Sequence, residues 1–405
     1  MKKKSKVKEK KNIESNKNTV KQVGNITKYD IICHNEKKVT LSIVLNITNR
    51  KLIQSKKKYS KNNNENNIYN DVIISTKNCI KNILNQTYKD YELIIVIDNM
   101  DNNIYNQISE YIQEILKDNT NITCIKLNKK LDNKMIGNMY ANGKYITFID
   151  NYNYVLPTTY RKMIKKIEEY PYDVIIIDLN LINKDDKIIR KISSNIDNNV
   201  QNIELEYKNI LLSKMYTDFN NKVIKKEIMD KIMSNQDVSK EYEDIFLNFK
   251  LMNLVNSIAV VKDNLINLVY DDMIYEYSYY KKIFKAVNQI NEYAKKQKIY
   301  ETNLDIVEYL ILKYIIYVFL DSVAKTRNNA MYKKSTMDAE TLIKKLVPSF
   351  YQKNNNDKSN KNNKYMNNIQ FIEKCRYVGM IKIPNITTKI VYLLNHNIRY
   401  GRYFK

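Results

Sequence analysis

Residues 143–157 read GKYITFIDNYNYVLP, and this stretch decides the fold class. Five residues with strand-forming side chains, Tyr145 to Ile149, run directly into the polar segment Asp150 to Asn153. Ligands of α/β sheets bind outside the carboxyl ends of the strands. A strand that ends in a carboxylate and amides therefore indicates a candidate ligand site. The alternative interpretation is an ordinary strand followed by an Asn-rich turn.

Further apolar runs on both sides of this stretch predict more strands, with helices between them. Near-continuous runs such as VTLSIVLN (residues 39–46) and LIIVI (residues 93–97) suit strands that are covered on both faces. Ile104, Ile108 and Ile112 recur at helical spacing. Strands that alternate with helices predict an α/β fold with a mostly parallel sheet. The other predicted strands are 122–127, 173–179, 258–261 and 266–270, and helices are predicted over 204–215, 225–233, 242–255, 275–296 and 304–325.

Composition limits the classes of function. The hydrophobic fraction of 43% predicts a globular protein. The net charge of +24 is spread along the chain without a recognition motif, so we expect no nucleic-acid partner. The four cysteines show no CxxC spacing and are expected to be free thiols, and two distant histidines do not predict a zinc site. No apolar run follows the basic start, so no secretory signal is expected.

The ends of the chain differ in composition from the middle. Residues 1–38 are predicted to be a basic disordered tail, and residues 50–70 a polar insert in a domain that spans 39–272. A helical extension is expected over 273–350, in which the apolar region 304–324 carries four charges and predicts a buried helix rather than a membrane span. A low-complexity linker (351–366) and a basic C-terminal segment (367–405) follow.

Several motifs resemble those of family 2 glycosyltransferases, the GT-A fold enzymes of bacterial surface polysaccharide synthesis. Leu41–Arg50 (LSIVLNITNR) is similar to the family's opening "SIIIPVYN" strand. Cys79–Glu92 (CIKNILNQTYKDYE) closely resembles "CLDSILNQTYKDIE" and is the most specific match. Ile94–Asn102 (IIVIDNMDN) is similar to "IIVDDGSTD", with the second carboxylate kept as Asp98.

The resemblance continues in the family's order over residues 39–272. Lys134–Gly143 (KMIGNMYANG) resembles "RNxGLxxAxG", and Asp150–Asn153 falls on the "DSDD" metal and sugar-nucleotide motif. Phe219–Glu227 (FNNKVIKKE) is similar to "SWNKLYKRE", and Tyr242–Leu251 (YEDIFLNFKL) to "YEDLFFNLKL". The implied fold is a Rossmann-like GT-A domain with a C-terminal helical extension.

The resemblance also implies roles for individual residues. A donor site would contain Asn49, Asp98, Lys134 and Asp150, with Asp98 at the nucleotide base and Lys134 at the phosphates. Asp150 and Asn153 would bind a divalent metal, Mn or Mg, and Asp244 would be the catalytic base with Glu243 beside it. Single Asp, Lys or Glu residues of this kind are also common in turns, on solvated faces and at helix N-caps.

The predicted function is inverting transfer of a sugar from a nucleotide-diphospho-sugar, UDP-linked in most resembling enzymes, to a glycan or lipid-linked acceptor. Tyr152 and Asn153 replace carboxylates of the "DSDD" motif. The first alternative is therefore a degenerate relative that binds a sugar nucleotide or a partner enzyme without turnover, and the second is a basic scaffold or nucleic-acid binder. The expected location is cytoplasmic, with peripheral contact of the basic segments to anionic membrane.

Overall fold

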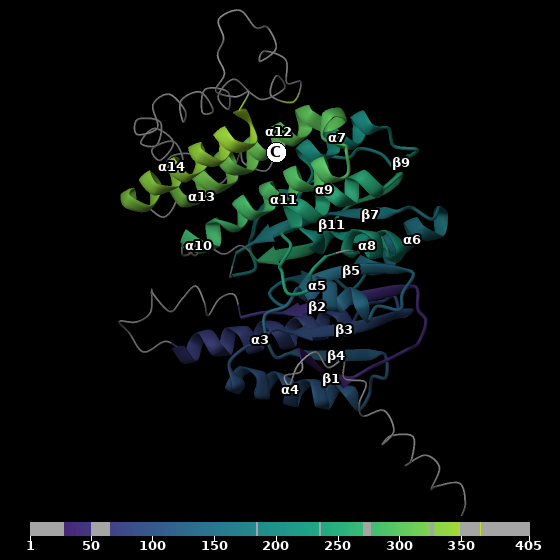
Figure 1. Cartoon of the computed structure of the whole chain (residues 1–405). Coiled ribbons are helices and arrows are strands. Elements are labelled where there is room, and N and C mark those ends of the chain that lie inside the picture. Colours follow the sequence, from purple (N-terminus) through teal and green to yellow (C-terminus); the bar gives the residue numbers. More distant parts are fainter. Residues whose placement is uncertain are drawn as a thin grey trace, which may run out of the picture.

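A computed structural model describes residues 28–49, 65–183, 185–234, 236–269, 277–324, 328–348 and 365. Within these ranges eleven strands form one sheet in the order β1-β4-β3-β2-β5-β10-β7-β11-β6, with β8 on β7 and β9 on β11. The C-terminal helices lie over the later strands, away from β1 and β4 (Figure 1). None of the helices in the described part of the chain combines the length and apolar character needed to cross a bilayer.

The first part of the sheet is parallel, as the apolar runs predict. Strands β2 and β3 are buried at every position. They pair in register, with Ile47 opposite Ile97, and β2 pairs on its other side with β5. The four strands are β2 (Leu41–Ile47), β3 (Tyr91–Ile97), β4 (Ile122–Leu127) and β5 (Tyr145–Asp150), and the helices between them are α3 (Glu65–Leu84), α4 (Asn102–Leu116) and α5 (Asn133–Met139).

Two glycines allow α5 and the start of β5 to approach β2 closely. A Cβ on Gly137 would lie 2.3 Å from Val44 Cγ1, and one on Gly143 would lie 2.6 Å from the Ser42 backbone nitrogen. Any side chain at Gly143 would therefore require the backbone to shift.

The sheet begins earlier than predicted. Strand β1 (Tyr29–Cys33) lies within the segment 1–38 that was expected to be disordered, and it pairs antiparallel with β4. The Asn128 side chain donates to Asp30 at 2.9 Å beside this pairing. The prediction of disorder is wrong for this strand, because neighbouring β4 supplies hydrogen-bond partners that the local composition does not reveal. Residues 1–27 and most of the insert 50–70 lie outside the described residues, and α3 begins within that insert at Glu65.

The later part of the sheet is mixed rather than mostly parallel. Strand β10 (Lys222–Lys225) lies between β5 and β7 and is antiparallel to both. The two short strands expected at 258–261 and 266–270 are one long strand, β11 (Ser257–Val269), which pairs parallel with β7 (Val174–Ile182) across a register shift. The remaining strands are β6 (Tyr154–Val155), β8 (Ile188–Ile192) and β9 (Val200–Gln201).

The helices fall close to the predicted ranges. The region 304–324 forms buried helices, as predicted, and Lys313–Leu320 has π-helical geometry. One hydrophobic core runs from the sheet into these helices, and a second core lies on the opposite face of the sheet. The helices are α6 (Thr159–Glu169), α7 (Leu205–Lys214), α8 (Lys226–Met233), α9 (Asp244–Leu254), α10 (Tyr277–Tyr280), α11 (Lys282–Lys296), α12 (Leu304–Leu312), η3 (Lys313–Leu320), α13 (Asp321–Ala324) and α14 (Asn329–Leu346), with short 3-10 turns η1 (Phe219–Asn221) and η2 (Glu301–Asn303).

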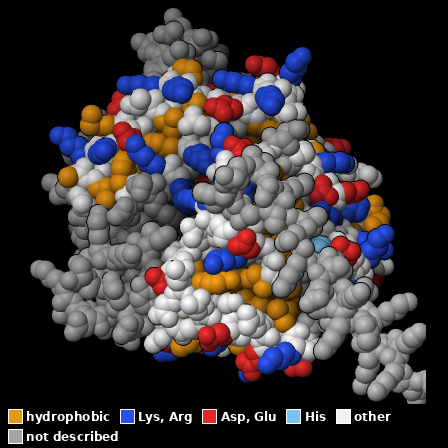
Figure 2. Space-filling model, turned by 60° about the horizontal axis from the view of Figure 1, so that its bottom comes forward, with side chains coloured by type: hydrophobic (Ala, Val, Ile, Leu, Met, Phe, Trp, Pro, Cys, Tyr) orange, Lys and Arg blue, Asp and Glu red, His pale blue; other side chains and the backbone are white. Residues whose placement is uncertain are grey.

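The space-filling view shows Lys and Arg side chains interspersed with Asp and Glu over the described surface of this face (Figure 2). The thiols of Cys33, Cys79 and Cys124 are free, as expected. Cys375, the linker 351–366 apart from Tyr365, and the segment 367–405 lie outside the described residues.

Candidate active site

Three of the predicted donor residues lie at one edge of the sheet. Asp98 directly follows β3, Asp150 is the last residue of β5, and Asn49 lies just beyond β2. The backbone N–H of Asp98 donates to the Ile47 carbonyl at 2.9 Å, and the Asp98 carboxylate accepts from the Asn99 N–H at 2.8 Å. Because β3, β2 and β5 are adjacent parallel strands, their carboxyl ends meet at this edge, where ligands of α/β sheets bind.

The loop after β5 is fixed by hydrogen bonds to neighbouring backbone. Buried Asn151 accepts from the Thr48 N–H at 3.3 Å, and the Tyr152 hydroxyl donates to the Thr48 carbonyl at 3.1 Å. The Asn153 side-chain oxygen accepts from the Val269 N–H of β11 at 3.2 Å. These three side chains hold the loop against β2 and β11. One of the two lone pairs of the Asn153 oxygen that was expected to bind metal is thus already engaged within the protein.

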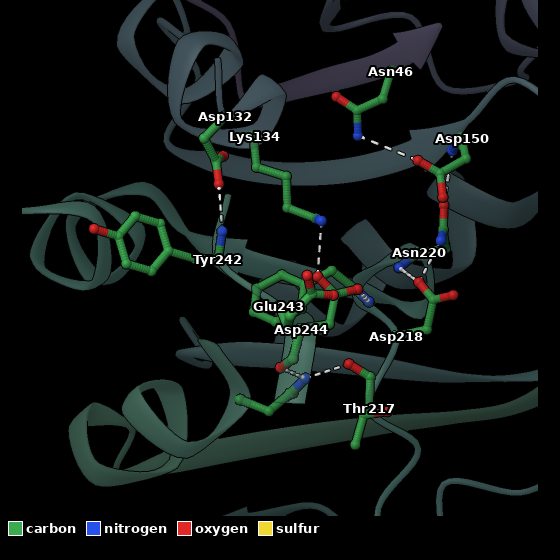
Figure 3. A network of polar contacts seen from close by, with 12 residues as sticks. Asn46, Asp132, Lys134, Asp150, Thr217, Asp218, Asn220, Tyr242, Glu243 and Asp244 are labelled. Carbon is green, nitrogen blue, oxygen red and sulfur yellow. Dashed lines mark hydrogen bonds and ion pairs between the residues drawn. The ribbon is translucent and has the colours of Figure 1, made fainter. Parts of the chain in front are cut away.

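Asp150 differs from the three residues that follow it, because its carboxylate faces other polar side chains. The Asn46 amide donates to Asp150 Oδ1 at 3.4 Å. The Asp150 backbone N–H donates to the Asn220 side-chain oxygen at 2.9 Å, and the Asn220 amide in turn donates to Asp218. Figure 3 shows Asn220 between Asp150 and Asp218. Turn η1 therefore brings a second carboxylate to the end of β5.

No motif in the sequence points to Asp218. It lies one residue before the segment that resembles "SWNKLYKRE", and a lone Asp before an Asn pair is typical of a turn. It does cap η1, by accepting from the Asn220 N–H at 2.8 Å. Burial, followed by repulsion from Asp244 and Asp150, raises the pKa of Asp218 to about 6.

Lys222 supports this turn from within the core. Its side chain is fully buried and donates to the carbonyls of Tyr216 at 2.9 Å and Asp218 at 2.5 Å, and to the Asn221 side chain at 2.9 Å. Burial lowers the pKa of Lys222 to about 8. The three acceptors compensate the buried ammonium group, so this lysine holds the Asp218 turn in place.

Lys134 and Asp244 form an ion pair across the site, with Lys134 Nζ 2.8 Å from Asp244 Oδ1 (Figure 3). The two side chains are only 19% and 24% exposed. Burial by itself would lower the pKa of Lys134. Attraction from Asp244, and then from Asp150 and Asp132, outweighs burial, so the pKa of Lys134 is raised and the lysine stays charged. The predicted phosphate-binding cation and the predicted base are thus direct neighbours.

Asp132 links α5, which carries Lys134, to the segment before α9, which carries Asp244. No motif in the sequence points to this residue. It caps α5 by accepting from the Met135 N–H at 2.8 Å, and its other oxygen accepts from the Tyr242 N–H at 3.0 Å. Burial raises the pKa of Asp132, against the attraction of Lys134. An Asp two residues before a helical lysine predicts an N-cap, but the link to Tyr242, 110 residues later, is tertiary.

Glu243 lies beside Asp244 in sequence and has a different partner. Its carboxylate is 3.9 Å from Lys282 on α11, which also lies 3.4 Å from Glu241. Lys285 of the same helix donates to the Glu241 carbonyl. The helical extension therefore anchors the segment that leads into α9. Glu243 reaches Lys282, whereas Asp244 reaches Lys134.

These observations define an α/β protein with a GT-A-like sheet, whose charged residues gather at the carboxyl ends of the strands. Residues 68–236 match the model of the Glycosyl transferase family 2 domain. No curated protein matches the chain.

Solved structures share the fold. The crystal structure of residues 1–349 of S. aureus TarS in complex with UDP superposes with a TM-score of 0.54 at 12% identity, over 90% of this chain and 93% of that chain. A second crystal structure of TarS 1–349 gives a TM-score of 0.53 at 11% identity with the same coverage. The predicted GT-A architecture with C-terminal helices is thereby confirmed.

Proposed function

We propose that this protein is an inverting glycosyltransferase that moves a sugar from a nucleotide-diphospho-sugar to a hydroxyl of a glycan or lipid-linked acceptor. The observation that carries the proposal is the Lys134–Asp244 pair, a cation and a carboxylate 2.8 Å apart near the end of β5. Sugar transfer needs both groups, because charge develops on the leaving diphosphate while the acceptor hydroxyl loses a proton.

The proposed roles combine the motif resemblance with the positions of the side chains. Asp98 and Asn49 would contact the nucleoside, and Lys134 the diphosphate. Asp244 would accept the proton as the acceptor oxygen attacks the anomeric carbon and the bond to the diphosphate breaks. Uridine is our choice of nucleoside, supported by the UDP bound in the TarS structure of the same fold. The physiological process would be synthesis of cell-surface polysaccharide.

A divalent metal, Mn or Mg, fits this site only together with the donor. In the described residues no three His, Cys, Asp or Glu side chains are grouped to hold a metal. Magnesium in phosphate-handling sites is bound by one or two carboxylates and completed by substrate oxygens and water. Asp150 is the carboxylate that would hold it, and Asn153 is the weaker candidate, since one of the two lone pairs of its oxygen already accepts from the Val269 N–H. The bound metal would neutralise charge on the leaving diphosphate.

A degenerate donor-binding protein is the second candidate. Tyr152 and Asn153 favour it, because they are bound to backbone where the resembling motif has carboxylates. Such a protein would bind nucleotide sugar and not turn it over.

Titration of the full chain with UDP and a panel of UDP-sugars, with and without manganese, tests the proposal when combined with assays of donor hydrolysis and transfer. Binding with turnover is expected. Binding without turnover on any acceptor would favour the degenerate protein. No binding to any nucleotide sugar would exclude both, and retention on polyanions tighter than that of proteins of equal charge would favour the scaffold.

We further propose a cytoplasmic location, with the basic segments 1–38 and 367–405 in contact with anionic lipid. Co-sedimentation with vesicles containing phosphatidylglycerol, compared with neutral phosphatidylcholine vesicles at rising salt, measures this contact. Equal sedimentation with both kinds of vesicle would argue against it.

A further inference from the structure

Both oxygens of the Asp244 carboxylate are engaged. Oδ1 lies 2.8 Å from Lys134 Nζ, and Oδ2 accepts from the Phe219 N–H at 3.2 Å. A base must present an oxygen to the hydroxyl proton that it removes. An ammonium group on one oxygen and a backbone N–H on the other compete with that hydroxyl.

Lys134 has more than one anionic neighbour. Besides Asp244, the carboxylates of Asp150 and Asp132 attract it. Its ammonium group ends a flexible four-carbon stem and donates to any anion within reach. A diphosphate carries more negative charge than one carboxylate, so it competes strongly for this cation.

We propose that Lys134 is shared between two partners: it pairs with Asp244 in the empty site and transfers to the diphosphate when the donor binds. The carboxylate becomes available to the acceptor hydroxyl only after this transfer. This inference rests on the proposed function, because it assigns Lys134 to the diphosphate of the same donor. It adds that the base is masked until donor binds.

The proposal has a thermodynamic consequence that does not depend on catalysis. If the ion pair must break for UDP to recruit Lys134, part of the binding energy of UDP is used to break it. Coupling between two such events is reciprocal and commonly changes affinity fivefold or more. Removing the charge of Asp244 should therefore tighten UDP binding, and it should do so only when Lys134 is present.

The test is a double-mutant cycle of UDP affinity, measured by calorimetry in the full chain at fixed ionic strength. Asp244→Asn is expected to lower the Kd for UDP by about fivefold or more. In the Lys134→Met background the same substitution should leave the Kd unchanged. Glu243→Gln is the matched control, because it removes one negative charge from the adjacent residue, whose partner is Lys282. It should change the Kd much less than Asp244→Asn.

The outcomes separate this inference from the proposed function. Wild-type binding of UDP with an unchanged or weaker Kd in Asp244→Asn would overturn the shared lysine and leave the donor site intact. An equal decrease of the Kd in Glu243→Gln would also overturn it, as would a decrease caused by Asp244→Asn in the Lys134→Met background. The effect would then come from general electrostatics. Failure of the wild type to bind UDP would instead refute the proposed UDP site. An Asn at 244 keeps an oxygen for the Phe219 N–H, and urea unfolding checks that each variant is folded.

Discussion

The loop after β5 and the ion pair between α5 and α9 use polar residues in opposite ways. In the loop, Tyr152 and Asn153 hydrogen-bond to backbone of β11 and of the segment after β2, so their polarity stabilises the fold. In the pair, Lys134 Nζ lies on Asp244 Oδ1, whereas backbone holds the other Asp244 oxygen through the Phe219 N–H. A backbone partner cannot be replaced without loss of structure, whereas a charged partner can be exchanged for a charged ligand. The partner of a polar side chain, rather than its type, therefore indicates which residues are free to act on substrate.

The largest effect is expected on the rate of transfer, for a change in the Lys134–Asp244 ion pair. Asp244→Asn should lower the rate of transfer by about 10²–10⁴-fold, because an amide cannot take up the hydroxyl proton. Glu243→Gln should lower the rate of transfer much less, since Glu243 lies toward Lys282. Steady-state assays of transfer with saturating donor measure both. Equal losses in the two variants would contradict the distinction between these neighbours.

The next largest effect is expected on stability, for changes in the loop after β5. Tyr152 is 9% exposed, so Tyr152→Asp would place a carboxylate in a buried position and should lower the free energy of unfolding by about 2–4 kcal/mol. Tyr152→Phe, which removes only the hydroxyl bond to Thr48, should cost about 1 kcal/mol. Urea unfolding measures both variants. Stronger manganese-dependent transfer in Tyr152→Asp would show instead that this position serves the metal.

A smaller effect separates Asn153 from Asp150. Asn153→Ala leaves the Val269 N–H without its acceptor and should cost about 1–2 kcal/mol of stability. It should leave the manganese concentration for half-maximal transfer unchanged. Asp150→Asn should raise that concentration about tenfold or more with little loss of stability. A similar dependence of transfer on manganese concentration in the two variants would indicate that Asn153 also binds the metal.

The last effect concerns Asp218 and appears only as a dependence of stability on pH. Its pKa is raised to about 6, above the ordinary 3.8, so between these values the folded protein holds a proton that the unfolded chain has released. Stability from this group is present at low pH and is lost as pH rises through 6. Asp218→Asn should therefore be more stable than wild type by up to about 3 kcal/mol at pH 7, and equal to it below pH 4. Urea unfolding at both pH values measures the difference, and a constant difference would mean that the carboxylate is not perturbed.

The apolar pattern was sufficient to predict the strands that are buried on both faces. β2 and β3 are buried at every position, so their continuous runs of Ile, Leu and Val are visible without tertiary information. β1 and β10 were missed for the opposite reason. Each is short and mixed in composition, and each is a strand because neighbouring strands supply its hydrogen-bond partners.

The candidate site divides in the same way. Asp98, Lys134, Asp150 and Asp244 could be proposed from motifs that resemble family 2 glycosyltransferases. Asp98 and Asp150 follow or end strands, and Lys134 and Asp244 lie in the first turns of helices. Asp132 and Asp218 could not be proposed. Their importance comes from contacts with Tyr242 and with the Asn220 that also binds Asp150, and no local spacing records those contacts.

The sequence by itself determined the alternation of strands and helices, the similarity of residues 68–236 to the Glycosyl transferase family 2 model and the charged residues at the strand ends. Only the tertiary structure decided which of those residues face each other. Hydrophobic burial is encoded residue by residue and can be read along the chain. The pairing of Lys134 with Asp244, and of Asn153 with Val269, depends on segments more than a hundred residues apart in sequence. Their distances are set by the packing of the whole sheet.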